Sequence, residues 1–398
     1  MLGAVLVSRR GYGLIDVAEA RARSRPGLKS VVRWMRAHEA LTLLIFIWLV
    51  GTAFALHRVL AVPNIWDTDY LNYWFAPRAM RAGVNVYDVD AYQRYGMSFF
   101  PSARETQFNF TYPPYALFLF WPLSYLPPYA SYAAWDAVSL AAFWIAAKRI
   151  LPKGFPAFLA VLSPATIICM QFGQTSLIAG ALFLAAAAGS GVAGGILTFK
   201  PQLGFLVAPL LLLKGWKPVL TAIGTMVALI LVSQILFGHW TDFLTHASSY
   251  QAGLIFDEQR KDVWYIIGTS PAMGYGRLGF AIYLVVATIV LVRNFNLWTA
   301  ATATFLISPY GFHYDMSVVC VGFAVLLYSY WDRMPLWQRL VASLAFLTPV
   351  IVEFGTWWVP PILLLGLFVQ TQCFPGVQLA WRQRRFALAE INCAEPRS

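Results

Sequence analysis

Two aspartates stand one residue apart in a hydrophilic segment, and their side chains could carry out proton-transfer chemistry. The segment reads Trp66-Asp67-Thr68-Asp69-Tyr70. A carboxylate beside a hydroxyl group can act as a general base. The D-x-D spacing can also hold a metal ion, and an aspartate before a helix often caps the helix N-terminus instead. For Asp67 we favour the capping or solvated role.

The residues that follow Asp69 have the spacing of a short helix. Over residues 70–81, side chains three or four positions apart would share one side of such a helix. The side chains on that side would be Tyr70, Tyr73, Trp74, Pro77 and Arg81. We therefore expect a helix directly after the pair of carboxylates.

Lys200 is an anomalous charge, because it interrupts an apolar stretch over residues 191–213 near its middle. A cation at the centre of a membrane span costs about 2.5–3.5 kcal/mol on insertion scales, so it requires a partner. A functional partner would be the phosphate of a lipid-linked substrate. A structural partner would be Gln174, a backbone carbonyl or a carboxylate such as Asp136. Both interpretations stay open.

His313 follows the helix-breaking residues 308–311 at the end of another apolar stretch. An imidazole there could contact a phosphate or a hydroxyl group of a substrate, or it could be an interfacial structural residue. Further cations that could bind a phosphate, or be solvated, are Arg260, Lys261 and Arg277. The four cysteines show no C-x-x-C spacing, which argues against a zinc site or a disulfide framework.

The elements that position these residues are membrane spans. The chain has 398 residues, of which 59% are hydrophobic and only 12% charged, against about 25% charged in soluble domains. Apolar stretches recur along the chain, and about 20 apolar residues cross a bilayer as a helix. The net charge of +11 gathers before the first stretch and after the last, which indicates cytoplasmic termini rather than nucleic-acid binding. We predict an all-α, polytopic transmembrane bundle.

Twelve candidate spans fit this pattern. They are residues 40–60, 113–127, 129–147, 154–170, 173–190, 191–213, 216–237, 277–293, 296–309, 313–331, 338–353 and 357–373. This count makes 61–112 and 238–276 outer loops, with short interfacial helices in the first. It also leaves the cations from Lys148 to Lys153 on the outside, against the charge rule. Prolines and glycines between 113 and 195 could mark short, broken or re-entrant helices.

The predicted organisation is a cytoplasmic basic tail over 1–38, a transmembrane domain over 39–375 and a cytoplasmic tail over 376–398. The first tail carries too many charges to hold the apolar region of a signal peptide, so we expect the first span to be retained.

Several short motifs follow one another in a characteristic order between about residues 40 and 330. They are Asp69-Tyr70-x-x-Tyr73-Trp74, Gly83-x-x-x-Tyr87-Asp88, Phe110-Thr111-Tyr112-Pro113-Pro114, Phe172-Gly173-Gln174, Lys200-Pro201-Gln202, and Ser308-Pro309 with His313. This ordered set resembles glycosyltransferase family 87, which are membrane enzymes of the GT-C superfamily. Ser176 stands where the family often has Asn, and Tyr314 where many members have a second histidine.

The resemblance implies a function and a site. It implies transfer of a sugar, mannose in this family, from a polyprenyl-phosphate donor to a lipid or glycan acceptor by an inverting single displacement. Asp69 would be the catalytic base. The substrate-binding candidates are Tyr73, Gln174, Lys200, Arg260 and His313. A lipid-phosphate donor has no pyrophosphate that requires a metal, so we expect neither metal nor cofactor. The site would lie on the extracytoplasmic face of the inner (plasma) membrane, among membrane lipids.

Two other function classes remain open at this stage. Many helices, an intramembrane lysine and broken helices would also suit a transporter or a lipid-linked sugar flippase. Against this, the acidic and aromatic residues gather outside the spans, and the two halves of the chain show no repeat. A ligase or polymerase of surface polysaccharide would share the lipid-linked donor, but its large outer loop would come late in the chain, whereas the charged motif here comes early.

Overall fold

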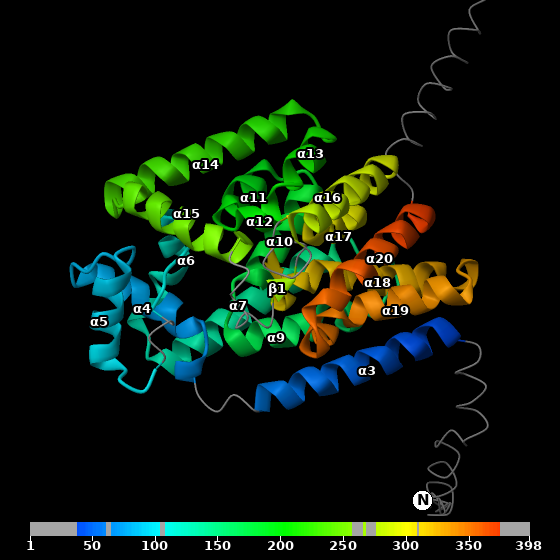
Figure 1. The fold of residues 1–398 in the computed structure, drawn as a ribbon, viewed down its shortest axis with the longest axis horizontal. Helices are drawn as coiled ribbons and strands as arrows, with labels where there is room; N and C mark the ends of the chain where they lie inside the picture. The colour runs from blue at the N-terminus through cyan, green and yellow to red at the C-terminus, as the bar shows by residue number, and fades with distance from the viewer. Residues whose placement is uncertain are drawn as a thin grey trace, which may run out of the picture. The chain divides into compact units, whose positions relative to one another are not determined.

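The computed structural model describes residues 38–60, 65–103, 108–256, 266–267, 276–308 and 310–374 (Figure 1). The chain divides into two compact units, residues 1–43 and 44–398, and the site described below lies within the second. Nearly all of the two predicted tails falls outside the described residues, as does Arg260.

The described part is almost entirely helical, as predicted. The longer helices are α3 (Glu39–Leu60), α7 (Pro128–Lys148), α14 (Trp216–Leu236), α15 (Trp240–Phe256), α16 (Gly276–Arg293), α17 (Leu297–Ile307), α18 (Ser317–Tyr330), α19 (Leu336–Ile351) and α20 (Val359–Cys373). The one small sheet among the described residues pairs β1 (Ile266–Ile267) antiparallel with β2 (Gly311–Phe312).

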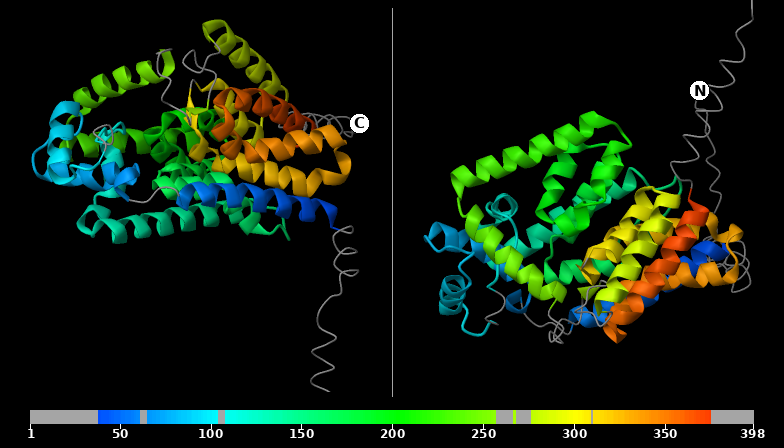
Figure 2. Two further views of the ribbon diagram at one scale, coloured as in Figure 1. Left: turned by 60° about the horizontal axis from the view of Figure 1, so that its bottom comes forward. Right: turned by 45° about the horizontal axis from the view of Figure 1, so that its top comes forward.

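Five helical segments of the described residues are long and apolar enough to cross a membrane. They are Glu39–His57, Trp216–Leu236, Gly276–Arg293, His313–Arg333 and Leu336–Phe354. In Figure 2, α14 (green) and α16 (yellow) each leave one long side uncovered. Large apolar side chains such as Ile235 and Leu278 are 82% and 75% exposed there. Water would not favour such faces, whereas lipid does, so the fold is that of a helical membrane protein.

The first predicted outer loop contains two helices, α4 (Tyr70–Arg81) and α5 (Val89–Phe99). The expected helix over 70–81 is therefore confirmed. Its burial is not limited to one side, because nine of its residues are buried. Phe75 lies at the centre of an aromatic cluster. Its ring centroid is 6.1 Å from that of Tyr92 and 5.6 Å from that of Phe108. The helix is packed into the protein by these aromatic contacts.

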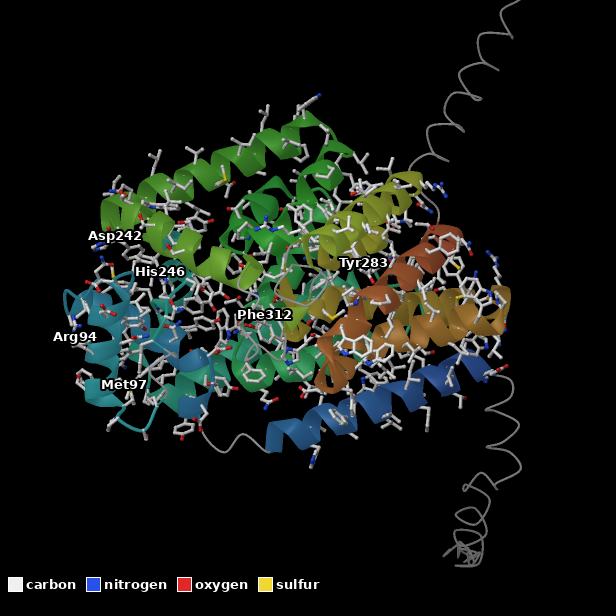
Figure 3. All side chains as sticks on the ribbon, viewed as in Figure 1. Arg94, Met97, Asp242, His246, Tyr283 and Phe312 are labelled. Atoms are coloured by element: carbon white, nitrogen blue, oxygen red, sulfur yellow. The ribbon has the colours of Figure 1, made fainter. Side chains whose placement is uncertain are left out.

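The second predicted outer loop packs against the first. Helix α15 carries Asp242 and His246 (Figure 3). The Asn85 amide donates to Asp242 Oδ2 at 2.7 Å, and His246 Nε2 lies 2.7 Å from Asn109 Oδ1. Burial lowers the pKa of His246, so its neutral imidazole is favoured at this contact. The contacts place both segments at the same end of the helix bundle, as the predicted topology requires.

The predicted span over 113–127 is not one helix. The chain forms three short pieces there, which are η3 (Pro114–Ala116), α6 (Leu117–Phe120) and η4 (Leu123–Tyr125). Prolines 113, 122 and 127 stand at the start of these pieces and of α7, where a ring in place of an amide hydrogen prevents helix continuation. None of the pieces is long enough to cross a bilayer.

The predicted span over 191–213 is a hairpin of short helices. Its first arm is α11 (Gly191–Ile196) with η5 (Leu197–Phe199), and its second arm is α12 (Pro201–Gly204) with α13 (Val207–Leu212). The arms touch where glycines permit it, because a Cβ added at Gly194 would lie 2.7 Å from Leu211 Cδ1 and one at Gly204 3.3 Å from Leu197 Cγ. The chain therefore turns back on itself, and Lys200 sits at the tip.

These two corrections remove the disagreement over the cations at the end of α7. The Tyr328 hydroxyl donates to Gly154 O at 3.4 Å, and the ring centroids of Tyr328 and Phe155 are 4.9 Å apart. The turn after α7 thus lies at the same end of the bundle as Arg333. Because 113–127 is not a span, the charge rule now assigns Arg333 and the cations from Lys148 to Lys153 to the same side of the membrane.

Candidate active site

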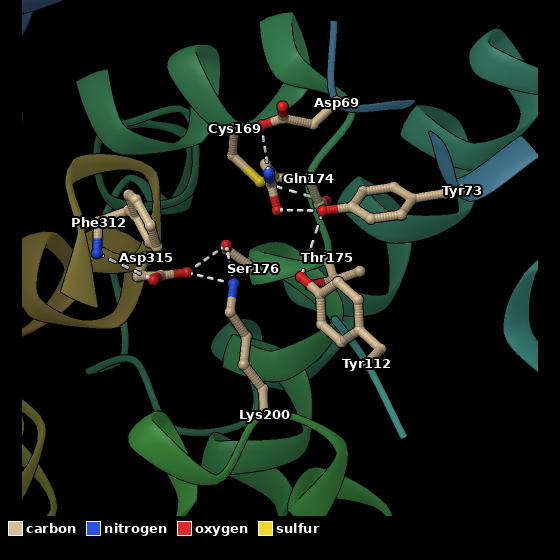
Figure 4. Close-up of polar contacts among 10 residues, drawn as sticks. All are labelled: Asp69, Tyr73, Tyr112, Cys169, Gln174, Thr175, Ser176, Lys200, Phe312 and Asp315. Carbon is tan, nitrogen blue, oxygen red and sulfur yellow. Dashed lines mark hydrogen bonds and ion pairs between the residues drawn. The ribbon is translucent and has the colours of Figure 1, made fainter. Parts of the chain in front are cut away.

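Asp69 occupies the N-cap position of α4, but its side chain does not cap the helix. It accepts a hydrogen bond of 2.5 Å from Gln174 Nε2 instead (Figure 4). Burial raises the pKa of Asp69 above its usual range, and the bond from Gln174 and the charge of Lys200 oppose that rise. A carboxylate of this kind is suited to proton transfer. Asp67 ends the preceding turn η1 (Ile65–Asp67).

Gln174 is positioned by a left-handed turn at the end of α9 (Pro164–Phe172). Gly173 has φ of 61°, and its carbonyl accepts from Trp135 Nε1 at 2.9 Å. A Cβ on Gly173 would lie 2.5 Å from the Cβ of Tyr70 and 2.6 Å from Tyr132 Cε2. Both the backbone angle and the close approach of α4 therefore require glycine at this position.

Tyr73 fixes the orientation of the Gln174 amide. Its hydroxyl donates to Gln174 Oε1 at 2.8 Å, so the amide nitrogen is directed at Asp69. The Tyr73 ring stacks on Phe120 with 4.9 Å between the ring centroids, and the Tyr73 hydroxyl lies 3.3 Å from the hydroxyl of Tyr112. Burial raises the pKa of Tyr73 well above its usual value, which keeps the phenol a neutral donor.

Lys200 forms a buried ion pair with Asp315, in η7 (His313–Met316). The Lys200 ammonium lies 2.5 Å from Asp315 Oδ1, and both side chains are almost completely buried. It also donates to Ser176 Oγ at 2.9 Å, and Ser176 donates to Asp315 Oδ1. The backbone amide of Phe312 donates to Asp315 Oδ2 at 3.0 Å. Lys200 thus has a carboxylate partner, as the structural interpretation required. That partner is Asp315 and not Asp136, and Gln174 binds Asp69 instead of Lys200.

Sequence reasoning missed Asp315. The signal was available, because a lysine buried in a membrane protein requires a compensating charge and Asp315 follows His313 by two residues at the start of a predicted span. Ser176 is the residue that joins this pair to α10 (Ser176–Ala187).

His313 is 1% exposed and lies beside the same group of residues. Its ring contacts Phe172 at 6.0 Å, next to the turn that carries Gln174. The pairing of β1 with β2 holds the backbone directly before it, with Phe312 opposite Ile266.

Three consecutive side chains connect the two charged centres. Gln174 binds Asp69, Thr175 Oγ1 lies 2.9 Å from the Tyr112 hydroxyl, and Ser176 binds Lys200 and Asp315 (Figure 4). The structure therefore brings together four of the five predicted substrate-binding residues with the predicted base, and Arg260 alone lies outside the described residues. Among the residues described, no three His, Cys, Asp or Glu side chains gather as metal ligands.

A small, partly open apolar cavity adjoins the ion pair. Its walls come from α10, α12, α17 and α18, and Asp315 is its charged lining residue. Representative lining residues are Gly180, Phe183, Leu203 and Phe305. The site thus has a carboxylate base at one end, a buried cation at the other and an apolar space beside the cation.

Comparison with protein families matches the chain to glycosyltransferase family 87 over residues 110–329. Curated protein sequences and solved structures give no match. The matched range contains Gln174, Lys200, His313 and Asp315, whereas Asp69 lies before it and joins the site through its bond to Gln174. The match covers more than half of the chain, which replaces the transporter and flippase hypotheses with a membrane enzyme. The chain belongs to glycosyltransferase family 87.

Proposed function

We propose that this glycosyltransferase moves a sugar, mannose as the first candidate, from a polyprenyl-phosphate donor to a hydroxyl group of a lipid or glycan acceptor. The observation that carries the proposal is the turn over residues 174–176, which connects a carboxylate with raised pKa to a buried cation. Sugar transfer from a lipid phosphate needs both groups, because one takes up a proton and the other stabilises negative charge.

The base end of the site is Asp69. Its carboxylate takes the proton of the acceptor hydroxyl while the acceptor oxygen bonds to the anomeric carbon of the sugar. The bond from that carbon to the phosphate oxygen breaks, and its electron pair leaves on the polyprenyl phosphate. Because attack and departure occur on opposite faces, the configuration inverts. Gln174 and Tyr73 hold the carboxylate in one orientation throughout.

The donor end is Lys200 with His313. An ammonium has three N–H donors, and among the described residues Lys200 directs two of them at Asp315 and Ser176. We assign the third to the donor phosphate.

The charge distribution supports an extracytoplasmic site. With 113–127 and 191–213 removed as spans, we infer ten crossings, and both termini stay on the cytoplasmic side with the cations after α7. The end that carries Asp69, α4 and α15 then faces away from the cytoplasm, as expected for the inner (plasma) membrane.

The test is sugar transfer in membranes that contain wild type or Asp69→Asn, supplied with radiolabelled polyprenyl-phosphate-mannose and lipids of the native host. Loss of the base should reduce transfer by about 10²–10⁴-fold. Asp67→Asn is the matched control and should keep wild-type activity, since Asp67 is two residues away in the preceding turn. An Asp69→Asn protein as active as wild type would overturn the base assignment. A wild type that transfers from no polyprenyl-phosphate sugar would overturn the donor assignment.

A further inference from the structure

Asp315 is a second buried carboxylate in the site, and the proton transfer described above does not use it. It accepts from three groups, which are Lys200 Nζ, Ser176 Oγ and the backbone amide of Phe312. Both oxygens of the carboxylate therefore accept hydrogen bonds, Oδ1 from Lys200 and Ser176 and Oδ2 from the Phe312 amide. Its orientation is fixed from two sides, by α10 through Ser176 and by the turn before η7.

Lys200 depends on Asp315 for both charge and place. It sits at the tip of a hairpin, where the chain turns between two short helical arms, so the backbone holds it less firmly than a continuous helix would. A buried ammonium without a compensating anion is favoured in its neutral form. A neutral amine cannot stabilise a phosphate that leaves with negative charge.

We propose that Asp315 is a positioning residue, which keeps the Lys200 ammonium charged and directed at the donor phosphate. This inference rests on the proposed function, because it requires the phosphate to bind at Lys200. Asp315 itself touches neither sugar nor phosphate, and Ser176 assists by bonding to both members of the pair.

The surroundings of Lys200 determine how a pH profile would report on this role. The titratable groups that face it are Asp315, Tyr314 at 5.4 Å, Cys169, Tyr112 and Asp69. His313 lies on the same short helix as Asp315, η7, and its ring packs on Phe172. Of the facing groups only Asp315 forms an ion pair with Lys200 among the described residues, so its removal should change the charge state of the lysine most.

The experiment measures kcat and donor KM against pH for wild type and Asp315→Asn in proteoliposomes. Asp315→Asn should lose activity as pH rises through the neutral range, about tenfold per pH unit once the lysine is mainly neutral. Wild type should keep its activity there. The double variant Lys200→Arg/Asp315→Asn should recover the wild-type alkaline limb at whatever rate it retains, because arginine does not lose its proton. Asp136→Asn, a carboxylate on α7, is the control and should leave the profile unchanged.

An Asp315→Asn profile with the shape of wild type would overturn the positioning role, whatever its amplitude, because a merely structural residue would scale the curve without shifting it. A wild type inactive at every pH would instead overturn the proposed donor site and this role with it. If Asp315→Asn does not accumulate, Asp315→Glu replaces it. That variant should raise donor KM and keep the alkaline limb, and an unchanged KM would contradict the proposal.

Discussion

Replacing Lys200 by methionine should lower the free energy of unfolding by about 3–5 kcal/mol, because it breaks a buried ion pair from one side only. The Asp315 side chain is 0% exposed and would keep only the Ser176 hydroxyl and the Phe312 amide as donors. Methionine is similar in length to lysine and fills irregular spaces well, so little packing is lost. The cost is therefore mainly that of an uncompensated buried charge.

The double variant Lys200→Met/Asp315→Asn separates charge from packing. Its asparagine oxygen can accept from the Phe312 amide while its NH2 group donates to Ser176, whose hydroxyl can act as the acceptor, and no charge remains buried. We expect it to lie within about 1–2 kcal/mol of wild type, since replacing both members of a buried pair is often nearly neutral. The coupling energy between the two positions should then be several kcal/mol, as for other residues in one network.

Chemical unfolding of the purified variants in lipid nanodiscs or detergent, at one pH, measures these differences. Lys214→Met is the matched control, because Lys214 is an exposed lysine just after the same hairpin, and it should change stability by about 0.5 kcal/mol or less. If Lys200→Met lies within about 1 kcal/mol of wild type, or if the two single effects simply add, the pair is not the buried, charged contact that we describe.

Two further predictions concern the turn that carries the amide. Gly173→Ala should lower the free energy of unfolding by about 1–2 kcal/mol through its left-handed backbone alone, and by more through its clash with Tyr70. Sugar transfer should fall as well. Gly154→Ala is the control and should stay active, because Gly154 also has a positive φ of 81° but has open space around it. Gln174→Ala removes a bond that lowers the pKa of Asp69, so that pKa should rise. Because the base acts as the carboxylate, the acidic limb of kcat/KM should move to higher pH, and a limb that stays in place would contradict the assignment.

The sequence was sufficient for the parts of the fold that follow from local patterns. The helix over 70–81 follows from residue spacing, and the apolar stretches over 216–237 and 277–293 are observed as α14 and α16. Such segments are continuous and mostly face lipid, so their composition alone determines them.

Length and hydrophobicity did not separate the hairpin from a single span, because its two arms together are as long and as apolar as one span. What distinguishes them is the glycines that let the arms approach, such as Gly194, and the proline after Lys200 that ends the first arm. The sequence indicated that Lys200 requires a carboxylate partner, but it did not single out which carboxylate. Asp315 is 115 residues away, and only the tertiary fold brings the two together.

The breaks in the helices and the polar residues of the site have a common physical origin. A polar side chain at membrane depth must be carried by backbone that leaves the regular helix, and such backbone is tolerated only inside protein or beside a cavity. The left-handed turn at Gly173 positions Gln174 in the site, and the tip of the hairpin carries Lys200. The helical backbone also ends with α17 before β2 and the short helix η7, which carries His313 and Asp315. A helix bundle without these interruptions would cross the membrane equally well, but it could not bring a base and a cation to one turn of three residues.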